Sequence, residues 1–274
     1  MAKNSRRERK TGLEIHIKTS EEIAIMREAG RIVAIAHKEM CNAIRPGVST
    51  LELDHIAETV IRDHGATPAF LGYPNNNGPD FPATITASIN QELVHGIPSK
   101  DRILKEGDII SLDTGCHYQG FVGDAAWTWP VGEIPATVQR LLDVTEQSLY
   151  EAIAASVVPN RVSDVAHATQ DYVEKHGYSV AREYTGHGVG REMHEDPQVP
   201  NWWPRKRSGK LDKVNAPMQP GMTFAIEPMV IAGRAQLKEL KDKWTVVTKD
   251  KSLCAHFEHT IAVTDGEPII LTLP

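Results

Sequence analysis

The sequence predicts an α+β protein in which two copies of a helix–helix–strand–strand unit pack about a pseudo-twofold axis, with a central antiparallel sheet and outer helices. Two observations lead to this prediction. Apolar residues recur at helical spacing in two pairs of segments, and short β-forming runs follow each pair. Landmarks of the first half then recur in the same order in the second half. The fold should therefore bring corresponding residues of the two halves together at its centre.

The first half is expected to begin with two helices, each opened by a capping-box pattern: Thr19 with Glu22, and Ser49 with Glu52. Pro46-Gly47 ends the first helix and Gly65 the second. A long loop rich in Pro, Asn and Gly then leads to a short predicted strand over Ala83 to Ser88.

The second half repeats this order. A helix is expected from Ile134-Pro135 to Pro159-Asn160, and Ser163 is expected to cap the next helix, which His176-Gly177 closes. The landmarks that correspond are Pro46-Gly47-Val48-Ser49 and 159–163, His64-Gly65 and His176-Gly177, His95-Gly96-Ile97 and His187-Gly188-Val189, and the pairs Gly107/Asp113 and Gly221/Glu227. The repeat thus predicts that Asp113 and Glu227 are symmetry mates at the centre.

Composition narrows the class of protein. The chain has 274 residues, of which 41% are hydrophobic and 24% charged, as in ordinary globular proteins. A net charge of −6 gives no general signal for DNA binding, and no apolar run approaches the length of about 18 residues that spans a membrane. Cys41, Cys116 and Cys254 are far apart and outside any CxxC pattern, which argues against a disulfide framework. We expect a cytoplasmic monomer.

Residues 1–14 are predicted to form a basic flexible tail, with its charges at Lys3, Arg6, Arg7, Arg9 and Lys10. Such a tail is either simply solvated or contacts an anionic surface such as RNA, which includes the ribosome. Residues 15–274 are predicted to form a single domain, with pseudo-repeats over about 15–130 and 131–274.

Two carboxylates are predicted to face each other on a β-hairpin. Asp113 and Asp124 flank the turn Tyr118-Gln119-Gly120, and a hairpin centred between Tyr118 and Gln119 would place them directly opposite each other. A bulge near Thr114 or Gly115 would shift this register. Like charges at such a position repel, so the pair requires a shared proton or a bound cation.

Further ligand candidates favour the cation. Glu227 and Glu258 also lie in apolar β runs, where an unpaired charge is costly, and His187 lies in a Gly-rich stretch. Four carboxylates and one imidazole carry too much negative charge for a proton-sharing dyad, and they suit two divalent ions such as Mn, Fe, Co or Zn. Two such ions activate water and polarise a carbonyl, which indicates peptide hydrolysis. His95 and His194 remain as neutral groups that bind the scissile amide or move protons.

Four segments together resemble type I methionine aminopeptidases: SINQELVHGIP (88–98), TGHGVGREMHEDP (185–197), PGMTFAIEPMV (220–230) and WTVVTKDKSLCAHFEHT (244–260). The resemblance covers residues 15–272 and implies the pita-bread fold. It also implies removal of the N-terminal methionine from nascent proteins and peptides whose second residue is small.

The resemblance implies a role for each site residue. Asp113 would bind one metal, His187 and Glu227 the other, and Asp124 and Glu258 would bridge both. His194 would contact the scissile carbonyl, His95 would lie near the substrate amine or the leaving nitrogen, and Glu227 would help to activate the water. By matching position, the methionine pocket would be lined by Phe70, Tyr73, Phe81, Thr86, Met193 and Trp244, although such residues also suit an ordinary core.

Three features depart from the commonest pattern of that family. Asn75-Asn76-Asn77-Gly78 lengthens the loop over 74–80, and an extension over 202–218 begins with Trp202-Trp203-Pro204-Arg205-Lys206-Arg207. The extension is interpreted as a surface loop with an aromatic side chain packed beneath it, or else as a lid or a ribosome-docking point. His256 and Cys254 replace the more usual Gln and Ser. Since His256 shares a strand face with Glu258, we hypothesise that it tunes this bridging carboxylate.

Two other functions would also use parts of this pattern. An Xaa-Pro aminopeptidase or prolidase of the same fold would use the same five ligands, but its last two glutamates are typically closer than the 31 residues between Glu227 and Glu258. Such an enzyme also lacks the WTVVTKD stretch. A non-catalytic binding protein that keeps the fold but has lost ligands is disfavoured, because all five ligands are present here.

Overall fold

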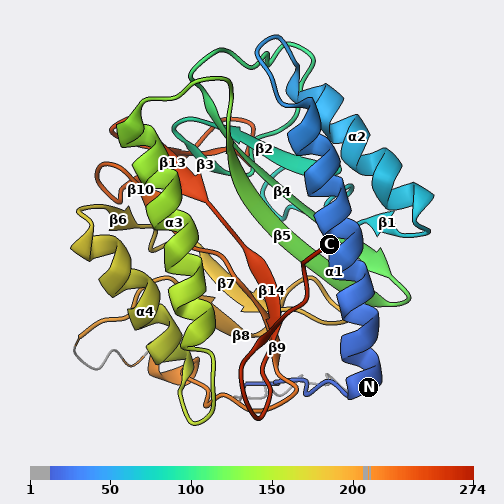
Figure 1. Ribbon diagram of the computed structural model, residues 1–274, viewed down its shortest axis with the longest axis vertical. Helices are drawn as coiled ribbons and strands as arrows, with labels where there is room; N and C mark the ends of the chain where they lie inside the picture. Colours follow the sequence, from blue (N-terminus) through green and yellow to red (C-terminus); the bar gives the residue numbers. More distant parts are fainter. Residues whose placement is uncertain (1–12, 206–208, 210) are drawn as a thin grey trace, which may run out of the picture.

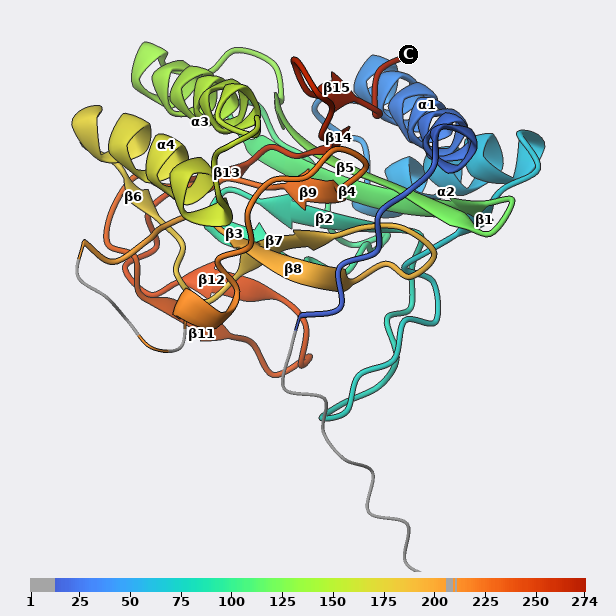
Figure 2. The ribbon, with the colours of Figure 1, turned by 90° about the horizontal axis from the view of Figure 1, so that it is seen from below.

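The computed structural model describes residues 13–205, 209 and 211–274. The basic residues expected in the tail, from Lys3 to Lys10, and Lys206 and Arg207 of the extension lie outside the described residues. Figure 1 shows two pairs of helices on either side of central strands, and Figure 2 shows that both pairs cover the same side of the sheets.

The helices are α1 (Ser20–Ala43), α2 (Thr50–Asp63), α3 (Ala136–Ala154) and α4 (Val162–Lys175), with a short 3-10 turn η1 (Leu211–Lys213). Both predicted capping boxes are confirmed, with Thr19 capping α1 and Ser49 capping α2. The cap predicted for α4 is wrong. Arg161 occupies that position, and its N–H donates to the Asp164 carboxylate at 2.7 Å, so Ser163 lies inside the helix. None of the described helices has the length and apolar character needed to cross a membrane.

The strands of the first half are β1 (Thr67–Pro68), β2 (Ile85–Ile89), β3 (Glu92–Val94), β4 (Ile109–Tyr118) and β5 (Phe121–Pro130). Those of the second half are β6 (Ser179–Val180), β7 (Thr185–Gly188), β8 (Glu195–Pro200), β9 (Thr223–Ile226), β10 (Met229–Ile231), β11 (Leu237–Glu239), β12 (Val246–Thr248), β13 (Cys254–His256), β14 (His259–Ala262) and β15 (Ile269–Ile270). The predicted strand at Ala83 begins two residues later, as β2.

Each half contributes one larger sheet. In the first half β1, β4 and β2 are neighbours, with β5 paired to β4, and in the second half β15, β14, β9, β7 and β8 follow in that order. The smaller sheets are β13-β10-β6 and β11-β12-β3, and every pairing between named strands is antiparallel. Gly107 and Gly221, each just before β4 or β9, both adopt a left-handed backbone, with φ of +84° and +85°.

Each half has its own hydrophobic core beneath its helices. Leu53 and Leu112 lie in the core that α1 and α2 cover, and Leu149 and Phe224 lie in the one beneath α3 and α4. Close approach helps to form the first core. A Cβ on Gly123 of β5 would lie 2.5 Å from backbone atoms of α1, so the helix packs directly on the strand.

The two halves meet at a central seam, defined here as the contacts between residues 124–128 of β5 and residues 256–260. The Glu258 N–H donates to the Ala126 carbonyl at 2.8 Å. On either side, the Thr260 hydroxyl donates to the Asp124 carbonyl at 2.7 Å and the His256 N–H donates to the Thr128 hydroxyl at 2.9 Å. The seam therefore holds Asp124 and Glu258 on adjacent segments.

The register expected for the central hairpin is wrong by two residues. The turn consists of Gln119 and Gly120 alone, with φ of +48° and +80°, so Asp113 pairs with Ala126 and Asp124 with Gly115. No bulge interrupts this ladder. A shift of two residues preserves the faces of the strands, so Asp113 and Asp124 remain on one face as diagonal neighbours.

Candidate metal centre and active site

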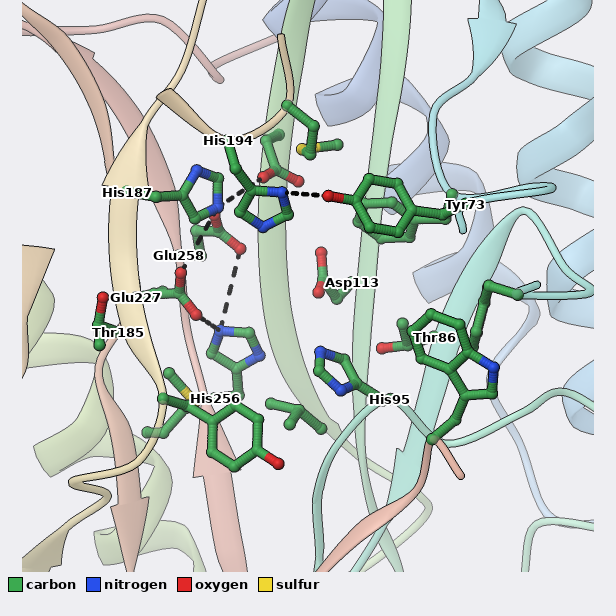
Figure 3. Close-up of a pocket in the computed structure, with 18 residues that line it drawn as sticks. Tyr73, Thr86, His95, Asp113, Thr185, His187, His194, Glu227, His256 and Glu258 are labelled. Carbon is green, nitrogen blue, oxygen red and sulfur yellow. Dashed lines mark hydrogen bonds and ion pairs between the residues drawn. The ribbon is translucent and has the colours of Figure 1, made fainter. Parts of the chain in front are cut away.

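A cavity of about 210 Å³ collects every site residue that the sequence predicted. It lies on the side of the sheet away from the helices: Leu112 and Ala125 pack in the core beneath α1, and side chains alternate along a strand, so Asp113 and Asp124 point the other way. Its lining includes Phe70, Tyr73, Phe81, Thr86, His95, Asp113, Asp124, His187, Met193, His194, Glu227, Trp244 and Glu258. Figure 3 shows their side chains converging from both halves.

The predicted metal ligands meet at the base of this cavity. His187 Nε2 lies 3.6 Å from Asp124 Oδ2 and 3.7 Å from Glu227 Oε1. Donor atoms of Asp124, His187 and Glu258 all lie within 4.8 Å of one another. His187 Nδ1 is 3.0 Å from the Gly188 carbonyl, which requires a hydrogen on Nδ1 and leaves the Nε2 lone pair facing the carboxylates.

Local structure explains how these side chains are placed. Pro228 cannot donate a ladder hydrogen bond, and Glu227 lies in the break between β9 and β10. Glu258 lies in the corresponding break between β13 and β14. Opposite Asp124, Gly115 leaves room for the carboxylate, since a Cβ there would lie 3.2 Å from Asp124 Oδ1 and 2.7 Å from Met193 Cε.

The electrostatics of the cluster call for a cation. Burial, followed by repulsion from neighbouring carboxylates, raises the pKa of Asp113, Glu227 and Glu258 well above the ordinary range. Burial also raises the pKa of Asp124 to about 7 and lowers that of His187 to about 3. Asp113 Oδ1, Asp124 Oδ1 and Glu258 Oε1 are buried without a hydrogen-bond partner in the described part of the chain. Buried oxygens in this state fit divalent metal ions, whose charge would allow the carboxylates to be ionised together.

Two further imidazoles border the cluster. His194 Nδ1 is 2.7 Å from the Tyr73 hydroxyl, and the His194 and His187 rings lie 4.1 Å apart. His95 has a φ of +62°, an unusual conformation for a residue other than Gly, and its ring meets those of Tyr184 and Trp244 edge-on. Burial, reinforced by His194, lowers the pKa of His95 to about 4, so this imidazole is neutral at pH 7.

The predicted methionine pocket is an aromatic wall beside this cluster. The rings of Phe81 and Trp244 pack edge to face with centroids 5.0 Å apart, and the Trp244 indole N–H donates to the Pro79 carbonyl at 2.9 Å. Asn75, in the lengthened loop, donates to the Lys243 carbonyl at 2.9 Å. The loop over 74–80 is thereby tied to the segment that carries Trp244.

Some lining residues were missed by sequence reasoning: Val94, Tyr184, Thr185 and Met229. For two of these residues, the position in the sequence could have indicated that they line the cavity. Thr185 opens the segment that contains His187, and Met229 follows Glu227 by two residues. Of the described residues of the 202–218 extension, Trp203 is only 6% exposed and packs in the core under α3 and α4, which fits the interpretation with an aromatic side chain packed beneath.

Known proteins resemble this chain over nearly its whole length. The model of metallopeptidase family M24 matches residues 24–265. The chain belongs to metallopeptidase family M24. It is 52% identical over 255 residues to methionine aminopeptidase 1 of Bacillus subtilis (strain 168), which covers 93% of this chain and 98% of that protein. The crystal structure of methionine aminopeptidase from Thermotoga maritima superposes with a TM-score of 0.89 at 41% identity, covering 95% of this chain and all of that one.

Structures of the proline-specific class are more distant from this M24 chain. The Xaa-Pro dipeptidase from Bacillus anthracis superposes with a TM-score of 0.73 at 24% identity, and the match covers 93% of this chain but 61% of that one. This likeness shows the shared fold alone. The predicted pita-bread fold is confirmed, and the prolidase interpretation is less supported than the methionine aminopeptidase one.

Proposed function

We propose that this chain removes the N-terminal methionine from nascent proteins and peptides with a small second residue, using two divalent metal ions. The observation that carries the proposal is the meeting of five metal-donor side chains, three buried and two half-buried, with an aromatic and thioether-lined cavity of about 210 Å³. Such a cavity suits the thioether side chain of methionine. The M24 relatives named methionine aminopeptidases support the same substrate class.

The ligands divide between the two ions. Asp113 would hold one ion, His187 and Glu227 the other, and Asp124 and Glu258 would be shared; Co, Mn, Fe and Zn all suit this donor set. When bound, such ions polarise the scissile carbonyl and lower the pKa of the attacking water. The shared position of Asp124 and Glu258 is supported by the seam, which holds their strands together through the Ala126 carbonyl.

The remaining polar groups would act on the substrate. His194, with its Nδ1 engaged by Tyr73, would present Nε2 to the scissile carbonyl. His95, neutral and buried, would lie beside the substrate amine or the leaving nitrogen. Glu227, ionised beside the metal ions, would take the proton of the attacking water. The methionine side chain would pack against Phe70, Tyr73, Phe81, Thr86, Met193 and Trp244.

The discriminating experiment compares peptides on the metal-loaded protein. Release of methionine from Met-Ala-Ser, with little cleavage of Xaa-Pro peptides, is expected because the pocket favours an apolar thioether at the first position. Preferential cleavage of Xaa-Pro peptides would restore the prolidase interpretation. Failure to release methionine with any of the four metals would favour a binding protein instead.

We further infer that the chain acts as a cytoplasmic monomer made of one catalytic domain over 15–274, with a basic tail over 1–14 that contacts the ribosome. The charge of the tail supports this contact, and the seam between the two cores supports a single domain. Deleting residues 1–12 should weaken cosedimentation with ribosomes in low salt and leave hydrolysis of Met-Ala-Ser unchanged.

A further inference from the structure

His256 lies against the two glutamates of the metal cluster in an unusual state. Its side chain is 2% exposed, and Nε2 is buried without a hydrogen-bond partner among the described residues. This nitrogen lies 3.7 Å from Glu227 Oε2 and 3.9 Å from Glu258 Oε2. Figure 3 shows the ring directed at both carboxylates. Each separation is about 0.5–0.7 Å longer than a hydrogen bond of about 3.2 Å, so a small movement would close either one.

The carboxylate of Glu227 lies between two imidazoles with different tasks. Oε1 faces His187 and Oε2 faces His256, at 3.7 Å in both cases. His187 presents a lone pair, since its Nδ1 hydrogen is directed at the Gly188 carbonyl. A hydrogen on Nε2 of His256 would let this nitrogen donate to the Glu227 oxygen that faces it. The lone pair of His187 therefore suits a metal ion. The N–H of His256 would suit Oε2 of Glu227, the oxygen that faces away from His187.

The backbone of His256 is held by one hydroxyl of the opposite half. The Thr128 hydroxyl donates to the His256 carbonyl at 2.8 Å and accepts the His256 N–H at 2.9 Å. Ser111 Oγ lies 2.9 Å from Thr128 Oγ1, and since the single Thr128 hydrogen is already donated, Ser111 must be the donor. The hydrogen-bonding capacity of Thr128 is thus fully used, and Ser111 and Thr128 are both buried.

We propose that His256 is a positioning residue, anchored through Thr128 and Ser111, whose Nε2–H orients the carboxylates of Glu227 and Glu258 for metal binding. The inference rests on the proposed function, and it assigns a task to the position where this chain departs from the usual glutamine. The hydrogen bonds from Ser111 through Thr128 to His256, called the relay below, cross the seam. Residues of the first half would thereby set the geometry of ligands from the second half. Outer partners of this kind typically contribute about 10- to 100-fold to metal affinity.

The test uses two matched pairs of variants. His256→Leu removes the donor at similar volume, and His256→Gln replaces it with an amide donor. Thr128→Val removes the anchoring hydroxyl at the same shape, and Thr128→Ser retains it. Cobalt(II) affinity is read from a visible absorption titration of the full chain, with proton NMR of the cobalt-loaded protein counting the imidazole N–H signals shifted by the ion. Far-UV circular dichroism checks that each variant folds.

His256→Leu should weaken cobalt binding by about 10- to 100-fold and His256→Gln by less than about threefold. Thr128→Val should weaken it by several-fold, and Thr128→Ser should match the wild type. Unchanged affinity in His256→Leu, or no rescue by His256→Gln, would overturn the proposal. Loss in His256→Gln of an imidazole N–H signal shifted as strongly as that of His187 would also overturn it, because His256 would then bind the metal directly. If the variants behave as expected and the wild type never cleaves Met-Ala-Ser, the proposed function fails while the positioning role stands.

Discussion

The Tyr73 hydroxyl lies 2.7 Å from Nδ1 of His194, across a gap of more than a hundred residues in the sequence. A phenol that donates to this nitrogen leaves the imidazole hydrogen on Nε2. In that form His194 can donate to a substrate carbonyl, and a Tyr73→Phe variant tests whether Tyr73 holds it so. The two rings meet edge-on with centroids 5.6 Å apart, so the contact also sets the orientation of the imidazole.

Tyr73→Phe should lower kcat for Met-Ala-Ser by about 3- to 10-fold, the equivalent of one lost hydrogen bond, because the ring remains but the orienting hydroxyl is gone. KM should change less, since the wall of the pocket keeps its aromatic ring. Steady-state kinetics measure both constants. Tyr118→Phe, at the end of the central hairpin, is the control and should leave them unchanged. A kcat equal to that of the wild type would show that Tyr73 does not orient His194.

Glu258→Gln should lower the metal content of the purified protein and reduce activity by about 100-fold or more, because a shared ligand loses its charge at constant shape. Metal analysis by mass spectrometry, paired with Met-Ala-Ser hydrolysis, measures both effects. Glu267→Gln changes an exposed glutamate in the following loop and should have neither effect. Full activity in Glu258→Gln would contradict the bridging role.

Gly123→Ala should lower the free energy of unfolding by about 1–3 kcal/mol or more. The added Cβ would lie 2.5 Å from the Ala29 carbonyl carbon and from the Gly30 nitrogen, and these backbone atoms cannot turn aside as a side chain can. Urea unfolding followed by circular dichroism measures the change. Gly266→Ala, whose Cβ would find no atom nearer than 3.9 Å, should stay within about 0.5 kcal/mol of the wild type. Equal stability of the two variants would mean that α1 is free to move away from β5.

The ion pair between Lys18 and Glu195 predicts a pH-dependent stability. Its side chains are 5% and 7% exposed, with Nζ and Oε2 2.5 Å apart. Burial raises the pKa of Glu195. The hydrogen bond and the charge of Lys18, together with hydrogen bonds from two backbone N–H groups, lower this pKa by more. The pKa of Glu195 is therefore below its ordinary value. A lowered carboxyl pKa contributes stability above the unfolded value of about 4.3, and this stability is lost as the pH falls through the folded value.

Glu195→Gln should therefore cost roughly 1.5–3 kcal/mol near pH 7, and this cost should shrink as the pH falls below about 4. Urea unfolding of wild type and variant at several pH values measures the difference. The comparison is Glu58→Gln, which breaks the more exposed pair with Arg62 and should cost less than about 0.5 kcal/mol at any pH. A cost for Glu195→Gln that does not vary with pH would show that its charge is not what stabilises the fold.

The helices were predictable because their signals are local. The capping boxes at Thr19 and Ser49 use residues three positions apart, so they depend on no distant contact. The cap of α4 was missed because Arg161 is an unusual residue at that position, although Asp164 binds its N–H. The register of the central hairpin was missed for a related reason: its two-residue turn places Gln119, in place of the usual Asn, at a φ of +48°.

The candidate ligands could be read from the sequence, because a carboxylate inside an apolar β run needs a counter-charge wherever that strand is buried. Asp113, Asp124, Glu227 and Glu258 were found in this way, and the internal repeat indicated that Asp113 and Glu227 meet. Only the tertiary structure decided how the ligands face one another. The seam joins segments more than a hundred residues apart through a side-chain hydroxyl and individual backbone hydrogen bonds. Such contacts produce no periodic pattern in the sequence. For the same reason, the relay from Ser111 through Thr128 to His256 became visible only once the two halves were packed together.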